Sequence, residues 1–153
     1  MIVAFALFGA GITIFDINFS HFLRGQFQMG AGFRSFLEFP RESQGFAVVF
    51  YGVMLGAATE RRVFVIAAMT TAAGMTALAL LPPRIIPDSV AGIVPALPLI
   101  GFVMVHSAGM HLSTVMEQSI IIESGSQDGA GRRLGWVGFW RTVGALVAAI
   151  AIL

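Results

Sequence analysis

The sequence contains no cysteine and no lysine, and only 11% of its residues are charged, against roughly 25% in an ordinary soluble domain. The lack of cysteine excludes disulfides, thiolate metal ligands and a cysteine nucleophile. The net charge of +1 provides no basic excess that would attract nucleic acid, so no nucleic-acid partner is expected. Hydrophobic residues make up 57% of the chain and the mean hydropathy is +0.86. This composition indicates an integral membrane protein whose main partner is the lipid bilayer.

Long apolar stretches follow one another along the chain. A helix of about 20 residues rises about 30 Å, which matches the hydrocarbon core of a bilayer. We therefore predict an all-α membrane protein in which residues 1–153 form a single transmembrane helical domain. About five spans are expected, at residues 2–22, 44–59, 63–81, 95–123 and 134–153.

The segments between these stretches predict how the spans are connected. No basic residue precedes Arg24, so the first span is expected to be a retained helix and not a signal peptide. The polar residues 24–43 are expected to hold a short helix that lies at the membrane interface or leads into the next span, and Pro40 would kink or end it. Residues 60–62 form so short a connection that the second and third spans must make an antiparallel hairpin. Three prolines between residues 82 and 87 break the chain before the fourth span.

Short motifs at these connections suggest a family. The run Gly56-Ala-Ala-Thr-Glu60-Arg61 resembles the Gly-x-x-x-Asp-Arg/Lys signature of major facilitator superfamily transporters at the cytoplasmic turn after their second helix. Glu60 stands where aspartate is usual, and the Gly-x-Arg-Arg continuation is absent. Three further stretches are similar to bacterial members of this superfamily, namely residues 37–46, 107–112 and 131–135.

The resemblance implies a fold of two six-helix halves that hold substrate between them near the membrane midplane. It also implies secondary active transport of an unidentified small molecule or ion by alternating access, in a bacterial inner membrane. The adjacent arginines 61–62 and 132–133 are then cytoplasmic by the positive-inside rule. Because five spans are expected and the chain closes on Ala-Ile-Leu, we expect an incomplete half, with the remaining transporter half supplied by the same gene or a second chain.

Two other function classes stay open: a small oligomeric transporter or channel, and a non-transporting membrane anchor subunit. The sequence has no Walker loop for ATP-driven pumping and no H-E-x-x-H or G-x-S-x-G motif, so no enzyme and no cofactor are predicted. His106 and His111 are five residues apart, roughly 140° around a helix, and so do not face one metal or haem.

Ionisable residues inside apolar spans are the leading site candidates, because a charge at the bilayer centre is costly and is rarely kept without a role. Asp16 shares a helical stripe with Gly9, Thr13 and Ser20, so we expect it to face other helices or a cavity. Its functional interpretation is a proton-coupling or substrate-binding carboxylate. The alternative is a helix-to-helix hydrogen bond or a position near the outer interface.

The fourth span carries His106, Gly109, Ser113 and Glu117 on one stripe. His106 is a substrate or proton-coupling candidate, although a hydrogen-bonded packing histidine is favoured. Glu117 is a further candidate, or a carboxylate that snorkels to the surface. Arg141, two turns inside the fifth span, is expected to pair with an acid such as Glu117 or to snorkel.

Small residues recur at helical spacing in several spans, and we predict that they allow close helix packing, with a dimerisation surface as the alternative. The groups are Gly52 with Gly56, Thr70 with Gly74, and, beside Arg141, Gly138, Gly144, Ala145 and Ala148.

Overall fold

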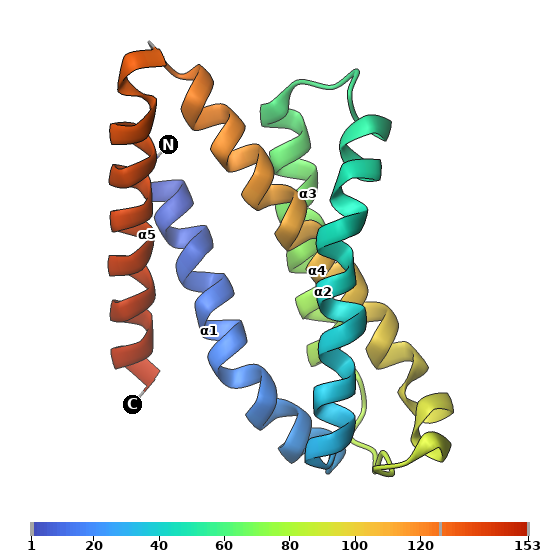
Figure 1. Ribbon diagram of the computed structural model, residues 1–153. Coiled ribbons are helices and arrows are strands. Elements are labelled where there is room, and N and C mark those ends of the chain that lie inside the picture. Colours follow the sequence, from blue (N-terminus) through green and yellow to red (C-terminus); the bar gives the residue numbers. More distant parts are fainter. Residues whose placement is uncertain (1, 126, 153) are drawn as a thin grey trace. The chain divides into compact units, whose positions relative to one another are not determined.

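A computed structural model describes residues 2–125 and 127–152, and its regular structure over those residues is helical throughout (Figure 1). The described residues form five α-helices: α1 (Ile2–Phe27), α2 (Ala31–Met54), α3 (Glu60–Ala79), α4 (Ile93–Glu123) and α5 (Ala130–Ile152). Single turns of 3-10 helix, Val90–Gly92 and Gln127–Gly129, precede α4 and α5. The predicted all-α fold class is confirmed for the described part of the chain.

The chain divides into two compact units, whose boundaries lie within α1 and α4. One unit contains the chain up to Phe19 together with the chain from Val115 onward. The other contains Ser20–Thr114. The single domain predicted from the sequence therefore consists of two units, which are described separately below.

Among the described residues, three helical segments are long and apolar enough to cross a membrane: Val3–Phe27, Glu60–Ala79 and Val90–Glu123. They coincide with the predicted first, third and fourth spans. Three helices of this length and apolar composition suggest a membrane protein. The other two predicted spans fall in α2 and α5, and their insertion in a membrane stays a prediction.

Pro40 does not end a helix, because α2 continues through this residue; a kink at Pro40 stays a prediction. A proline removes one backbone donor and crowds the preceding turn, so it usually kinks or ends a helix. Here Pro40 is buried, and the hydroxyl of Ser107 on α4 donates a hydrogen bond to the Arg41 carbonyl beside it. One helix therefore covers both the short helix and most of the second span that the sequence predicted as separate segments.

The turn between α2 and α3 also differs from its prediction. Residues 55–59 form it, stabilised by a hydrogen bond from the Ala58 amide to the Leu55 carbonyl at 2.8 Å. Glu60, Arg61 and Arg62 belong to the first turn of α3 and are not the connection itself. The carboxylate of Glu60 interacts favourably with the positive end of the helix dipole, and this favours a helix that begins at Glu60.

The segment between α3 and α4 anchors the start of α2. The cap residue Gly30 has no side chain to satisfy the first free amides of the helix. The carboxylate of Asp88 takes that role, because its Oδ1 accepts a hydrogen bond from the Phe33 amide at 2.6 Å. The amides of Arg84 and Ile86 bond to carbonyls at the end of α1, at 3.2 and 3.0 Å. A capping carboxylate distant in the sequence therefore sets where α2 begins.

Two glycines bring the backbones of α3 and α4 close together. A methyl group on Gly109 would lie 2.5 Å from the Thr71 nitrogen and 2.6 Å from the Ala67 oxygen. A methyl group on Gly74 would lie 2.5 Å from the backbone nitrogen of His106. The predicted packing role is thus confirmed for Gly74, whereas the contact at Gly109 involves Thr71 and not Thr70.

The glycines of the other predicted small-residue faces differ in how closely another helix approaches them. A methyl group on Gly144 of α5 would lie 3.0 Å from the Ala6 carbonyl of α1, so this glycine serves close packing within its unit. Gly52 and Gly138 have no described atom within 4 Å of that position. Packing within the described chain therefore does not account for glycine at these two positions.

Candidate functional site

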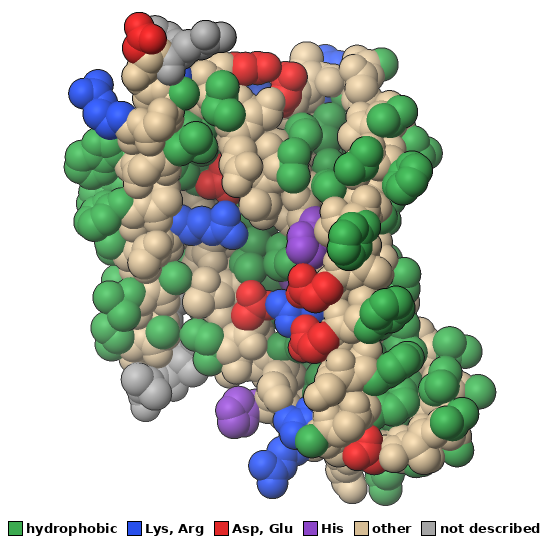
Figure 2. All heavy atoms as spheres, viewed as in Figure 1, with side chains coloured by type: hydrophobic (Ala, Val, Ile, Leu, Met, Phe, Trp, Pro, Cys, Tyr) green, Lys and Arg blue, Asp and Glu red, His purple; other side chains and the backbone are tan. Residues whose placement is uncertain are grey.

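Charged side chains gather on α2 where it lies against α4, within the unit Ser20–Thr114. We call Glu38, Arg41, Glu42 and His111 the α2–α4 cluster. An Arg41 guanidinium nitrogen lies 3.1 Å from a Glu38 carboxylate oxygen and another lies 3.7 Å from one of Glu42. The Nε2 atom of His111 is 3.8 Å from a Glu42 oxygen. In Figure 2 acidic, basic and histidine side chains meet over α2, amid apolar side chains.

Backbone and packing contacts hold the α2–α4 cluster together. Ser107, which is fully buried, donates its hydroxyl hydrogen bond to the Arg41 carbonyl. One turn further along α4, His111 lies beside Gly45, where a methyl group would meet the imidazole at 3.4 Å. Two of the stretches that resembled transporters, residues 37–46 and 107–112, therefore meet in space although they lie far apart in the sequence.

Glu38, Arg41 and Glu42 were not among the residues selected from the sequence as site candidates. They fall in the polar stretch 24–43, which was expected to precede the second span at residues 44–59. The signal that could have found them is three charged residues within five positions, directly followed by an apolar run at helical spacing.

His106 occupies a different environment from His111. It is completely buried against Gly74 of α3, and its Nδ1 lies 3.5 Å from the Thr71 carbonyl. Because a carbonyl only accepts, that contact requires the proton on Nδ1. The surroundings of His106 are those of the hydrogen-bonded packing histidine that the sequence favoured, and its coupling role stays a prediction.

In the other unit, Glu117 of α4 and Arg141 of α5 form an ion pair with an N–O distance of 3.4 Å. Glu117 is 4% exposed, and the arginine side chain is 32% exposed. The arginine stem lies over Gly9 of α1, where a methyl group would collide with it. The predicted pairing of Arg141 with Glu117 is confirmed, and the burial of the carboxylate shows that it does not snorkel outward.

Asp16 lies on an exposed part of α1. Gly9, at the start of its stripe, is buried, but Asp16 and Ser20 are exposed. The buried face of α1 is formed by Phe5, Ile12 and Phe19, which follow one another at intervals of seven residues. The coupling role proposed for Asp16 stays a prediction.

The turn motif lies apart from the α2–α4 cluster along the chain. Gly56 is in the turn, and Glu60 and Arg61 begin α3, with Gly56 and Arg61 exposed. Within residues 2–125 and 127–152, no group of three or more histidine, aspartate or glutamate residues is arranged to hold a metal ion. Comparisons of the chain with protein-family models, curated proteins and solved structures find no match.

Proposed function

We propose that this protein is part of a secondary transporter that moves a small solute across a membrane by alternating access. The observation that carries the proposal is the α2–α4 cluster, which contacts the middle of a span-length helix. A charged side chain at the bilayer centre costs about 2.5 kcal/mol or more, and such residues usually mark substrate or ion pathways.

The depth of the α2–α4 cluster follows from its contact with α4. If the segment Val90–Glu123 crosses the bilayer, Ser107 lies close to its midpoint. The backbone carbonyl of Arg41 accepts the hydrogen bond from Ser107, so the backbone of α2 at Arg41 lies at the same depth. We infer that α2 also crosses the membrane in spite of its charges, because its charged segment lies beside the centre of α4 and not beside an end.

The exposure of the carboxylates supports a water-filled pathway. The side chains of Glu38 and Glu42 are 51% and 59% exposed. Hydrocarbon cannot solvate a carboxylate, so this face of α2 must meet an aqueous cavity or another part of the transporter. Both are expected where a transporter half faces its substrate. Glu42 and His111 supply a carboxylate and an imidazole, which are suited to binding a polar solute or a proton.

Uptake into liposomes tests this proposal. The whole protein that the gene encodes is reconstituted with an internal pH-sensitive dye, and sugars, amino acids, organic anions and organic cations are offered one class at a time. One class is expected to accumulate. Loss of a hydrogen bond to a charged group costs about 1.5 kcal/mol or more, so Glu42→Gln and His111→Gln should each lower uptake at least about tenfold.

Glu123→Gln is the matched control, because it removes the same charge from an exposed position at the far end of α4. Its uptake is expected to equal that of the unaltered protein. Equal uptake by Glu42→Gln and Glu123→Gln would contradict the role of the α2–α4 cluster, and no uptake of any solute class would contradict transport itself.

A further inference from the structure

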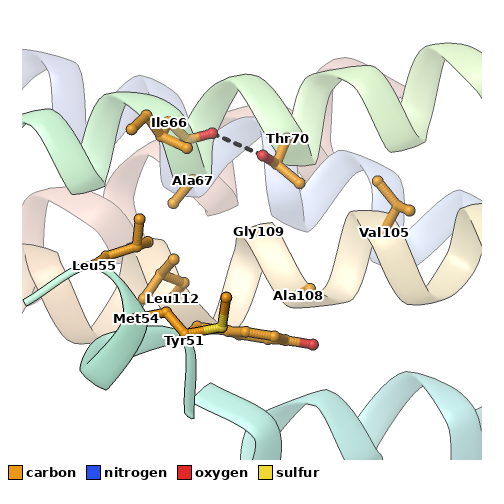
Figure 3. A pocket seen from close by; sticks show the side chains of 10 residues that line it. All are labelled: Tyr51, Met54, Leu55, Ile66, Ala67, Thr70, Val105, Ala108, Gly109 and Leu112. Atoms are coloured by element: carbon orange, nitrogen blue, oxygen red, sulfur yellow. Dashed lines mark hydrogen bonds between the residues drawn. The ribbon is translucent and has the colours of Figure 1, made fainter. Parts of the chain in front are cut away.

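An apolar pocket of about 330 Å³ opens among α2, α3 and α4, close to the α2–α3 turn (Figure 3). Tyr51 contributes from α2, Ile66 and Thr70 from α3, and Ala108 and Gly109 from α4. The short side chain of Ala108 leaves space on the α4 side, and Gly109 lets α3 and α4 approach closely behind it. The pocket is roughly twice the ~150 Å³ of an apolar cavity that accepts benzene, so it can hold a stretch of hydrocarbon chain.

The two hydroxyl groups on the wall of this pocket are already used. Tyr51 donates its phenolic hydrogen to the Gln44 side-chain oxygen at 2.6 Å. Thr70 donates to the Ile66 carbonyl of its own helix at 2.9 Å, the bond drawn in Figure 3. The remaining lining side chains are apolar. A ligand that fits this surface is therefore itself apolar over the part that enters.

The guanidinium group of Arg62 belongs to the same face of α3 as two residues that line the pocket. Arg62, Ile66 and Thr70 follow one another at intervals of four residues, which places them on one helix face. Arg62 is exposed, one turn from the pocket toward the start of the helix. Arg61 is also exposed, but four residues on from it lies Val65, which does not line the pocket.

We propose that this pocket binds one acyl chain of an anionic phospholipid, whose phosphate pairs with Arg62. The helix α3 is long and apolar enough to span a membrane, and Arg62 lies in its first turn. At a rise of 1.5 Å per residue, Ile66 and Thr70 lie about 6 and 12 Å deeper than Arg62. A cation at headgroup level above an apolar pocket matches the two ends of such a lipid, and basic sites between membrane helices bind acidic headgroups in this way.

Native mass spectrometry of the delipidated full chain in detergent tests the proposal. Dioleoyl phosphatidylglycerol is the probe, with dioleoyl phosphatidylcholine and oleate as comparisons. Phosphatidylglycerol is expected to bind most tightly. Arg62→Gln should weaken it about fivefold, the usual contribution of one basic residue beside an anionic lipid. Arg61→Gln changes the same charge on a neighbouring face and should weaken binding less than about twofold.

Filling the pocket should displace the acyl chain. Ala108→Phe is expected to abolish retained phosphatidylglycerol, whereas Ala72→Phe, at an exposed position on α3 outside the pocket, should leave it unchanged. Val105→Phe is a second filling variant at a position that is 42% exposed, for use if Ala108→Phe does not give the helical circular dichroism of the parent.

Three outcomes would overturn the phospholipid site. Equal losses with Arg62→Gln and Arg61→Gln would show unspecific attraction. Oleate bound as tightly as phosphatidylglycerol would point to a free fatty acid. Lipid retained by both filling variants would exclude the pocket. None of these measurements depends on transport, so the site and the proposed function fail independently.

Discussion

The contact of α3 with α4 predicts a large difference between two glycine-to-alanine substitutions in one helix. In Gly109→Ala the new methyl group would lie 2.5 Å from the Thr71 nitrogen and 2.6 Å from the Ala67 oxygen. Both atoms are backbone, so the helices must move apart. In Gly101→Ala the methyl group meets no described atom within 4 Å.

The expected magnitude follows from two terms. Alanine favours a helix interior over glycine by up to about 1 kcal/mol, and this gain is common to both variants. Overpacking a tight contact costs about 1 to 3 kcal/mol, and only Gly109→Ala incurs that cost. Gly109→Ala should therefore have a free energy of unfolding about 1 to 3 kcal/mol below that of Gly101→Ala.

Unfolding in mixed micelles by increasing the mole fraction of dodecyl sulfate, followed by far-ultraviolet circular dichroism, measures both variants under one condition. Gly74→Ala, whose methyl group would lie 2.5 Å from the His106 nitrogen, should resemble Gly109→Ala. Equal stabilities of Gly109→Ala and Gly101→Ala would refute the close approach of α3 and α4.

Three further predictions follow from named contacts. In a double-mutant cycle on the same unfolding assay, Glu117→Gln and Arg141→Gln should be coupled by about 1 to 2 kcal/mol. Arg141→Gln should lower the free energy of unfolding more than Glu117→Gln, because it leaves a buried carboxylate unpaired. A coupling of zero would contradict the ion pair. Asp88→Ala should lower the free energy of unfolding by about 1 kcal/mol and speed amide hydrogen exchange at the start of α2. Asp88→Asn keeps a side-chain oxygen that can cap the helix, so its stability and exchange should be closer to those of the parent. Unchanged exchange in Asp88→Ala would exclude the cap. Ser107→Ala should cost about 1 kcal/mol through the lost bond to the Arg41 carbonyl, and an unaltered stability would argue against that bond.

Much of the fold was readable from composition and periodicity. Apolar runs of sufficient length predicted the three helices that can cross a membrane, because a helix must be about 20 residues long to span hydrocarbon. The spacing of three and four residues also predicted that His106, Ser113 and Glu117 share one stripe of α4, and each of them is buried. The cost of an unpaired guanidinium in a span predicted the partner of Arg141, although snorkelling stayed open until the contact was seen.

The α2–α4 cluster could not be predicted in the same way. Local reasoning expected a kink or an end at Pro40, because proline removes a backbone donor, and it kept the whole polar stretch 24–43 out of the predicted span. Glu38, Arg41 and Glu42 lie in that stretch. Only the contacts with Ser107 and His111, more than sixty residues away in the sequence, place these charges beside the middle of α4.

The sequence by itself therefore determined which segments suit hydrocarbon, because hydropathy and length are properties of each segment alone. The tertiary structure decided which polar groups meet. It made Asp88 the cap of α2, paired Glu117 with Arg141 and assembled the α2–α4 cluster. Such pairings depend on how helices dock, and docking is set by close contacts such as those at Gly74 and Gly109, which no single segment encodes.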